Sequence, residues 1–151
     1  MPRFEIIEAQ PYHCGQIVRR LRHDYHAAFR LLGIDPHREL RTCFDASYMR
    51  RAWLIDGKLE AVGGAFGGAL SSESYIWLAI SQDATRYPKA MLTEARKQLA
   101  QVTAIKHVVI ASTLATDDAA GRFIMRLGFK PHESLCETGW IWQRELLQEA
   151  A

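Results

Sequence analysis

Two cationic side chains flank the start of a predicted helix near residue 88, where they could bind an anion. Arg86 and Lys89 lie on either side of Pro88, which suits the first position of a helix. The first amides of a helix have no partner within it and the helix dipole attracts negative charge, so phosphate groups bind well there. Pro88 removes one amide donor, which the two side chains could replace. Alternatively, both are solvated charges at a helix start.

A second informative segment runs from Asp117 to Phe129, with the sequence Asp-Asp-Ala-Ala-Gly-Arg-Phe-Ile-Met-Arg-Leu-Gly-Phe. Asp117 or Asp118 can accept hydrogen bonds from the first free amides of a helix. Gly128 fits a left-handed residue after that helix, and Phe129 would then turn back onto the core. The segment therefore predicts a short, capped helix.

Hydrophobic spacing predicts the elements that position these residues. We expect a strand over residues 4–8 and then one long amphipathic helix that ends at Gly33. The core-facing stripe of this helix has spacings of three and four residues and consists of Ile17, Leu21, Tyr25, Ala28 and Leu32. A turn and a short second helix within residues 37–48 follow.

The second half of the chain predicts an alternation of strands and helices. Asp56-Gly57 suits a type I′ turn and predicts a hairpin over residues 52–64. Strands are also predicted over 75–80, 106–112 and 139–146, and a further helix over 88–100. This order predicts an α/β fold (in the α+β sense) with a central mixed sheet and helices on both faces. We expect a single domain over residues 1–151.

In this order of elements, residues 117–129 resemble the N-x-x-A-x-x-x-Y-x-x-x-G-F signature of the GNAT N-acetyltransferases. Asp117 takes the place of the asparagine, Ala120 matches the alanine and Gly128-Phe129 close the motif, whereas Ile124 stands in place of the tyrosine. The order of the predicted elements is also that of the GNAT fold. The resemblance therefore implies a GNAT-like acyl-CoA N-acyltransferase fold over nearly the whole chain, with acetyl-coenzyme A (acetyl-CoA) as the cofactor.

The resemblance also implies where the cofactor would bind. In the family, the pyrophosphate lies on the pattern R/Q-x-x-G-x-G/A, which falls here on residues 85–90. Ala90 fits the last position, but Thr85 replaces the Arg or Gln and Pro88 replaces the first glycine. The residues that the resemblance places against acetyl-CoA are Ile80, Thr85, Arg86, Lys89, Ala90, Asp117 and Phe123.

Acetyl transfer needs a base that deprotonates the amine and an acid that protonates the leaving thiolate. The family often uses the motif tyrosine as the acid, but neither Ile124 nor its neighbour Phe123 can donate a proton. Glu73 and Tyr75, on or near a predicted strand, are the candidate bases. Glu73 could equally be an exposed turn residue, which is the commoner environment of a glutamate. A GNAT protein can also work without them if the amine arrives neutral and water relays the proton.

Two functions follow from the resemblance. One is an active N-acetyltransferase that moves acetyl from acetyl-CoA to a small-molecule or protein amine. The other is a GNAT-fold protein with weak or no transfer that binds protein partners. The chain also resembles GNAT-like virion or assembly proteins of short-tailed phages, in the turn 33–36, the strand end 61–64 and the run 122–124. This second resemblance favours the binding role, with phage particle components as partners and the host cytoplasm or the virion as the location.

Composition makes other classes of function less fitting. The formal net charge of +2 is too small to imply nucleic acid or a membrane as partner. The three cysteines form no disulfide or zinc pattern, and no apolar run resembles a signal peptide or a membrane span, so a cytoplasmic protein is expected. No metal is expected either, because His23, Asp24 and His26 lack further ligands nearby.

Three further features have predicted structural roles. The glycine-rich run 63–68 has no helix after it, so it predicts a bulge or a close approach of two backbones, and a phosphate loop is disfavoured. The basic stretch 19–22 is predicted to be a solvated face of the first helix. Trp140 and Trp142 alternate and should share one face of the last strand, which could be an edge available to a partner.

Overall fold

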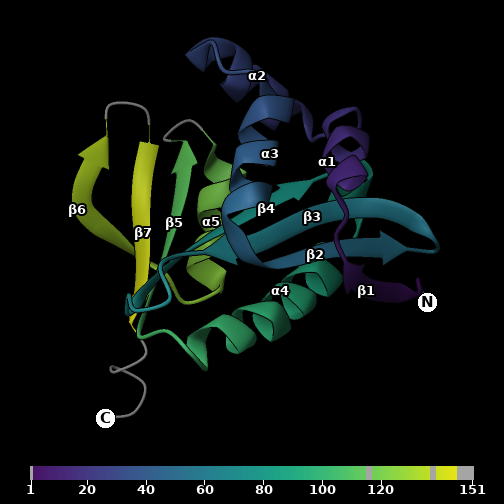
Figure 1. Cartoon of the computed structure of the whole chain (residues 1–151). Coiled ribbons are helices and arrows are strands. Elements are labelled where there is room, and N and C mark those ends of the chain that lie inside the picture. The colour runs from purple at the N-terminus through teal and green to yellow at the C-terminus, as the bar shows by residue number, and fades with distance from the viewer. Residues whose placement is uncertain (1, 115–116, 137–138, 146–151) are drawn as a thin grey trace. The chain divides into compact units, whose positions relative to one another are not determined.

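The structure is a computed structural model that describes residues 2–114, 117–136 and 139–145 (Figure 1). Its side chains are described for residues 2–113 and 117–130. The chain divides into two compact units. The first unit comprises Met1–Phe66 and Trp77–Tyr87, and the second comprises Gly67–Ile76 and Pro88–Ala151. Strand β4 (Glu73–Ile80) contributes residues to both.

The sheet of the first unit is antiparallel in its first three strands. Strand β2 (Ser47–Ile55) pairs with β1 (Phe4–Glu8) on one side and with β3 (Lys58–Phe66) on the other. The order of strands in this unit is β1-β2-β3-β4. Asp56 and Gly57 join β2 to β3 with φ angles of 51° and 81°. Both central residues of a type I′ turn need positive φ, so the predicted hairpin is confirmed.

Two helices cover this sheet and form the core of the first unit with it. Helix α1 (Pro11–Val18) and helix α3 (Pro36–Ala46) contact each other and both contact β3. Helix α3 confirms the short helix predicted within residues 37–48. The buried residues of the core are Ala9, Cys14, Ile17, Leu21, Leu40, Phe44, Ala52, Leu59, Val62 and Ala79.

The long first helix predicted from the sequence is wrong, because the chain forms two helices there. Helix α1 ends at Val18, and helix α2 (His23–Leu32) begins after a linker over residues 19–22. Within the linker, Leu21 forms an antiparallel bridge with Ser81 at the end of β4. This long-range pairing takes the backbone out of the helix although the apolar spacing continues through it. Helix α2 ends at Gly33 with a φ of 67°, as predicted.

The glycine-rich run lies where two backbones come close together. A Cβ atom built on Gly64 would lie 2.2 Å from the carbonyl oxygen of Met49 on the neighbouring strand β2. The pairing of β2 with β3 also shifts register between Ser47 and Met49, which marks a bulge. The predicted close approach is therefore confirmed, and the glycine at position 64 has a steric reason.

The sheet of the second unit is mixed. Glu73–Tyr75 of β4 pair in parallel with Val108–Ile110 of β5 (Val108–Leu114). Strand β7 (Gly139–Glu145) runs antiparallel between β5 and β6 (Lys130–Cys136). The last strand is thus confirmed, but the prediction that it is an edge is wrong, because it has a neighbour on each side (Figure 1).

Strand β6 was not predicted, and its sequence explains why. It reads Lys-Pro-His-Glu-Ser-Leu-Cys, which has little apolar alternation and contains Pro131. A proline lacks the amide that a central strand needs, so such a sequence fits only the edge of a sheet. The side chains of Trp140 and Trp142, for which a shared face was predicted, lie outside the described residues.

Helices α4 (Pro88–Thr103) and α5 (Asp118–Arg126) both contact β5 in the second unit. The buried residues of α4 follow helical spacing and are Met91, Ala95, Leu99, Val102 and Thr103. Helix α5 starts and stops as predicted, since Asp117 caps it and Gly128 follows it with a φ of 96°.

Among the described residues, no helix combines the length and the apolar character that a membrane span requires.

Candidate functional site

The segment that follows β4 corresponds to the predicted pyrophosphate loop, and in the structure it is a tight 3₁₀ turn. Helix η1 (Asp83–Arg86) forms this turn and begins two residues after the buried Ser81. The Ser81 hydroxyl accepts a hydrogen bond from the amide of Ala84 at 3.0 Å. The Thr85 hydroxyl donates to the carbonyl of Gln82 at 2.6 Å. The side chains of the loop therefore satisfy its own backbone.

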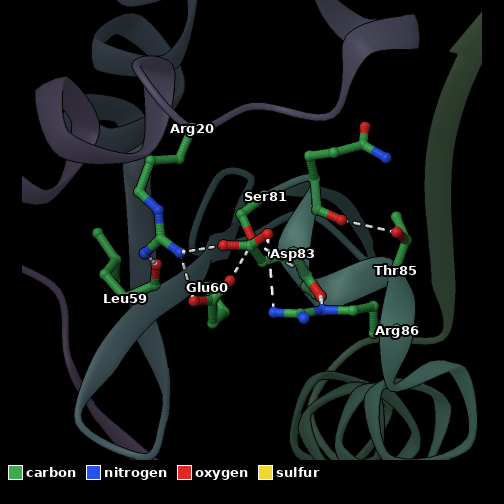
Figure 2. A network of polar contacts seen from close by, with 9 residues as sticks. Arg20, Leu59, Glu60, Ser81, Asp83, Thr85 and Arg86 are labelled. Carbon is green, nitrogen blue, oxygen red and sulfur yellow. Dashed lines mark hydrogen bonds and ion pairs between the residues drawn. The ribbon is translucent and has the colours of Figure 1, made fainter.

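A polar network ties this loop to the rest of the first unit (Figure 2). The guanidinium of Arg20 donates to Glu60 Oε1 at 2.5 Å and also to the carbonyl of Leu59. The other carboxylate oxygen of Glu60 accepts from the Ser81 hydroxyl. The Glu60 side chain is only 5% exposed, so both of its oxygens are removed from water and satisfied by the protein.

Asp83 lies between two arginines at the surface of this network (Figure 2). Its Oδ2 is 3.1 Å from the Arg20 guanidinium, and its Oδ1 is 3.8 Å from that of Arg86. Burial lowers the pKa of Arg20, but hydrogen bonds and charge from Glu60 and then from Asp83 outweigh burial and raise this pKa above its usual value. Arg20 therefore stays cationic, and one guanidinium is shared by two carboxylates.

The linker between α1 and α2 is held against the same loop by backbone hydrogen bonds. The amide of Arg22 donates to the carbonyl of Ile80, and the amide of Gln82 donates to the carbonyl of Arg20, both at 2.9 Å. The amide of His23 donates to the Gln82 side chain at 3.0 Å. The sequence-based expectation that residues 19–22 are a solvated helix face is wrong for Arg20 and for Arg22, which is buried.

The residues proposed to contact a cofactor divide between the two units. In the first unit, Ile80 is half-buried, while Thr85 and Arg86 are exposed and contact their own turn. In the second unit, Lys89 and Ala90 lie in the first turn of α4, which begins at Pro88. Asp117 and Phe123 are placed by α5, where the Asp117 carboxylate accepts from the amide of Ala120 at 3.2 Å. In the structure, Asp117 therefore caps the N-terminus of α5.

The two candidate bases lie on one face of β4. Glu73 and Tyr75 are two residues apart and both are exposed, whereas Ser74 between them is buried, as strand alternation requires. Tyr75 pairs with Ile110 of the parallel strand β5. At the position of the family's tyrosine acid, Ile124 is a buried residue of α5.

Sequence reasoning missed the network around Arg20 altogether. Its one local signal was Glu60, a carboxylate inside the apolar strand segment Leu59-Glu60-Ala61-Val62. A glutamate in such a place needs a buried partner. The partner is 40 residues away in the sequence, so spacing alone could not identify it.

As for metals, no group of three or more His, Cys, Asp or Glu residues in the described part of the chain could hold an ion.

Comparison with known proteins identifies the fold. No family model matches the sequence, and no curated protein matches it either. Solved structures do match. The GNAT domain of PAT from S. lividans is 14% identical with a TM-score of 0.72, over 96% of this chain and 90% of that one. The PaiA N-acetyltransferase from Thermoplasma acidophilum, solved in complex with coenzyme A, is 15% identical with a TM-score of 0.67, over 95% and 99%.

A third match is YncA, a putative acetyltransferase from Salmonella typhimurium solved with its cofactor acetyl-CoA. It is 17% identical with a TM-score of 0.59, over 98% of this chain and 96% of that chain. The chain therefore has the GNAT fold, and the α/β class with a mixed sheet that the sequence predicts is confirmed. Structural similarity at such low sequence identity shows the fold alone, because function depends on the residues of the site. The single-domain organisation stays a prediction.

Proposed function

We propose that this protein is a GNAT-fold binding protein that retains a weak site for acetyl-CoA and transfers acetyl groups weakly or not at all. The observation that carries the proposal is Ile124, a buried aliphatic side chain at the motif position of the acid. An aliphatic group cannot protonate a leaving thiolate. A reaction that lacks a positioned acid loses roughly 10²–10⁴-fold in rate.

The loop before α4 supports the weak cofactor site. Pro88 supplies no amide at the first position of α4, and Thr85 is bonded to the carbonyl of Gln82. The cations Arg86 and Lys89 are both exposed and remain as side-chain ligands for phosphate groups. Matching structures that contain coenzyme A or acetyl-CoA make this cofactor the natural ligand to test.

Thermal unfolding with and without millimolar acetyl-CoA tests the cofactor site. A ligand present at a hundredfold its dissociation constant stabilises the native state by about 2.7 kcal/mol, which raises Tm by several degrees. We expect a small rise in Tm that Arg86→Gln reduces and that Arg38→Gln leaves unchanged, since Arg38 is an exposed arginine on α3. The absence of any rise at saturating ligand would reject the cofactor site.

An active N-acetyltransferase is the second candidate, and one observation favours it. Glu73 and Tyr75 present two titratable groups on one exposed face of β4, beside the parallel strand β5. Release of free thiol from acetyl-CoA in the presence of polyamines and of lysine peptides would measure transfer. If this candidate holds, Glu73→Gln or Tyr75→Phe lowers kcat, and Glu39→Gln on the exposed surface of α3 does not.

The binding role includes a protein partner. The resemblance to phage virion proteins in residues 33–36, 61–64 and 122–124 supports a particle component as that partner, and a cytoplasmic or virion location. Co-expression of the chain with capsid and tail proteins, followed by isolation of assembled particles, tests this part of the proposal. A chain that never sediments with particles would contradict it.

A further inference from the structure

The Arg20 network contains equal numbers of positive and negative charges. Arg20 and Arg86 supply two positive charges, and Glu60 and Asp83 supply two negative ones. The two carboxylates differ in their surroundings. The Glu60 side chain is 5% exposed and also accepts a hydrogen bond from Ser81, whereas the Asp83 side chain is 54% exposed. Asp83 is therefore the carboxylate that another anion can displace from the arginines.

We propose that Asp83 is an intrachain competitor for a phosphate-type anion at Arg20 and Arg86. It occupies both guanidinium groups and thereby sets how tightly the loop after β4 binds a pyrophosphate. This inference rests on the proposed function for the identity of the ligand, which is the pyrophosphate of acetyl-CoA. In this scheme Asp83 limits the affinity for the anion, and Arg20 is an anion ligand that the sequence did not reveal.

The geometry of Arg20 suits an exchange of anions. Its guanidinium is fixed by the carbonyl of Leu59 and by Glu60 at 2.5 Å, which do not depend on Asp83. One nitrogen also reaches Asp83 at 3.1 Å. When Asp83 moves away, the guanidinium keeps its position and presents that N–H to an incoming oxygen. A donor that is already oriented loses little conformational entropy when it binds an anion.

Arg86 is the mobile member of the pair. Its side chain is 70% exposed, and its closest approach to the Asp83 carboxylate is 3.8 Å. A second contact to the carbonyl of Asp83 is 3.5 Å long. Exposed ion pairs of this length contribute little stability, so Arg86 can leave Asp83 at small cost. A phosphate offers several oxygens and more charge than a carboxylate, and arginine binds it in a bidentate manner.

Isothermal titration of inorganic pyrophosphate and of coenzyme A into the wild type and Asp83→Asn tests the inference. The asparagine keeps the size of the side chain and removes its charge, leaving a net charge of +1 in the network. We expect Asp83→Asn to bind both ligands about tenfold more tightly, and the gain to shrink at high salt. Asp24→Asn is the matched control, because Asp24 is an exposed aspartate (69%) that pairs with Arg22 at 3.5 Å.

A third variant separates loss of competition from a general change in the fold. In Asp83→Asn/Arg86→Gln, the gain in affinity should disappear while the Tm without ligand stays near that of Asp83→Asn. Unchanged or weaker pyrophosphate binding by Asp83→Asn would overturn the inference, as would an equal gain in Asp24→Asn. Measurable coenzyme A binding that is equally tight in wild type and Asp83→Asn rejects the inference and leaves the proposed function standing. A gain for pyrophosphate with no coenzyme A binding supports the inference and rejects acetyl-CoA as the ligand.

Discussion

Arg20 and Glu60 form a 2.5 Å ion pair that joins the linker between α1 and α2 to the buried face of β3. The Glu60 side chain is 5% exposed and that of Arg20 is 30% exposed, so the carboxylate depends on Arg20 and Ser81 for its partners. Removal of one member of a buried pair leaves the other charge uncompensated. We therefore expect Arg20→Met to lower the free energy of unfolding by about 3 kcal/mol, measured by urea denaturation.

The control for this prediction is an exposed pair. Lys97 lies 3.4 Å from Glu94 on α4 with its side chain 65% exposed, and Lys97→Met should cost less than about 1 kcal/mol. Adding Glu60→Gln to Arg20→Met should recover part of the loss, because the stranded charge is then removed. If Arg20→Met and Lys97→Met cost the same free energy of unfolding, the pair of Arg20 and Glu60 does not stabilise the fold. The same conclusion follows if adding Glu60→Gln to Arg20→Met recovers none of the loss.

The contrast between this pair and the hairpin shows which parts of the structure the sequence could predict. The turn at Asp56-Gly57 needs only two residues that tolerate positive φ, so it can be read locally. The same holds for the cap at Asp117 and the left-handed residue Gly128. The break between α1 and α2 depends on a bridge from Leu21 to residue 81, far along the chain, and no local pattern predicts it.

The candidate site follows the same division. The motif positions of Thr85, Pro88 and Ile124 could be identified from the sequence because the resemblance fixes them by order along the chain. The environment of Arg86 could not be identified in this way. Arg86 contacts Asp83, which is only three residues away in the sequence. Asp83 also pairs with Arg20, and this second contact depends on the folded position of the linker between α1 and α2. Charge balance at a site of this kind is a property of the folded chain.

Gly64 offers a steric test of the close approach between β3 and β2. A Cβ atom there would lie 2.2 Å from the carbonyl oxygen of Met49, which is backbone and cannot move without breaking the pairing of the two strands. We expect Gly64→Ala to lower the free energy of unfolding by about 3 kcal/mol, measured by urea denaturation. Gly15→Ala in helix α1 is the control, because its nearest neighbour would be 3.7 Å away. Alanine favours a helix over glycine, so this variant should be neutral or stabilised by up to about 1 kcal/mol.

The cap of α5 gives a prediction about the motif position at residue 117. The Asp117 carboxylate accepts from the amide of Ala120, so Asp117→Ala should lower the free energy of unfolding by about 1 kcal/mol. Asparagine also accepts at this position and should cost close to nothing. Asp118 is exposed in the first turn and contributes only through the helix dipole, so Asp118→Ala should cost about 0.5 kcal/mol. A loss in Asp117→Asn as large as that in Asp117→Ala would show that the negative charge, and not the cap, is what matters.

His13 makes the stability of the first unit depend on pH. It is buried in α1, and its Nδ1 accepts a hydrogen bond from the amide of Gln10 at 2.8 Å. Burial lowers the pKa of His13 below its usual value of 6.5, so the unfolded chain binds the proton more readily than the folded one. The contribution of neutral His13 is therefore complete above pH 6.5, and it is lost as the pH falls from there through the lowered pKa of the folded state.

This dependence can be isolated with His13→Gln. Glutamine can keep the reciprocal cap with Gln10 and does not titrate, so the variant should lose less free energy of unfolding between pH 7 and pH 5 than the wild type. Urea denaturation at several pH values in this range measures the difference. His23→Gln is the matched control for the substitution itself, because His23 is exposed at the start of α2. Parallel profiles for wild type and His13→Gln would mean that another group governs the acid sensitivity of the fold.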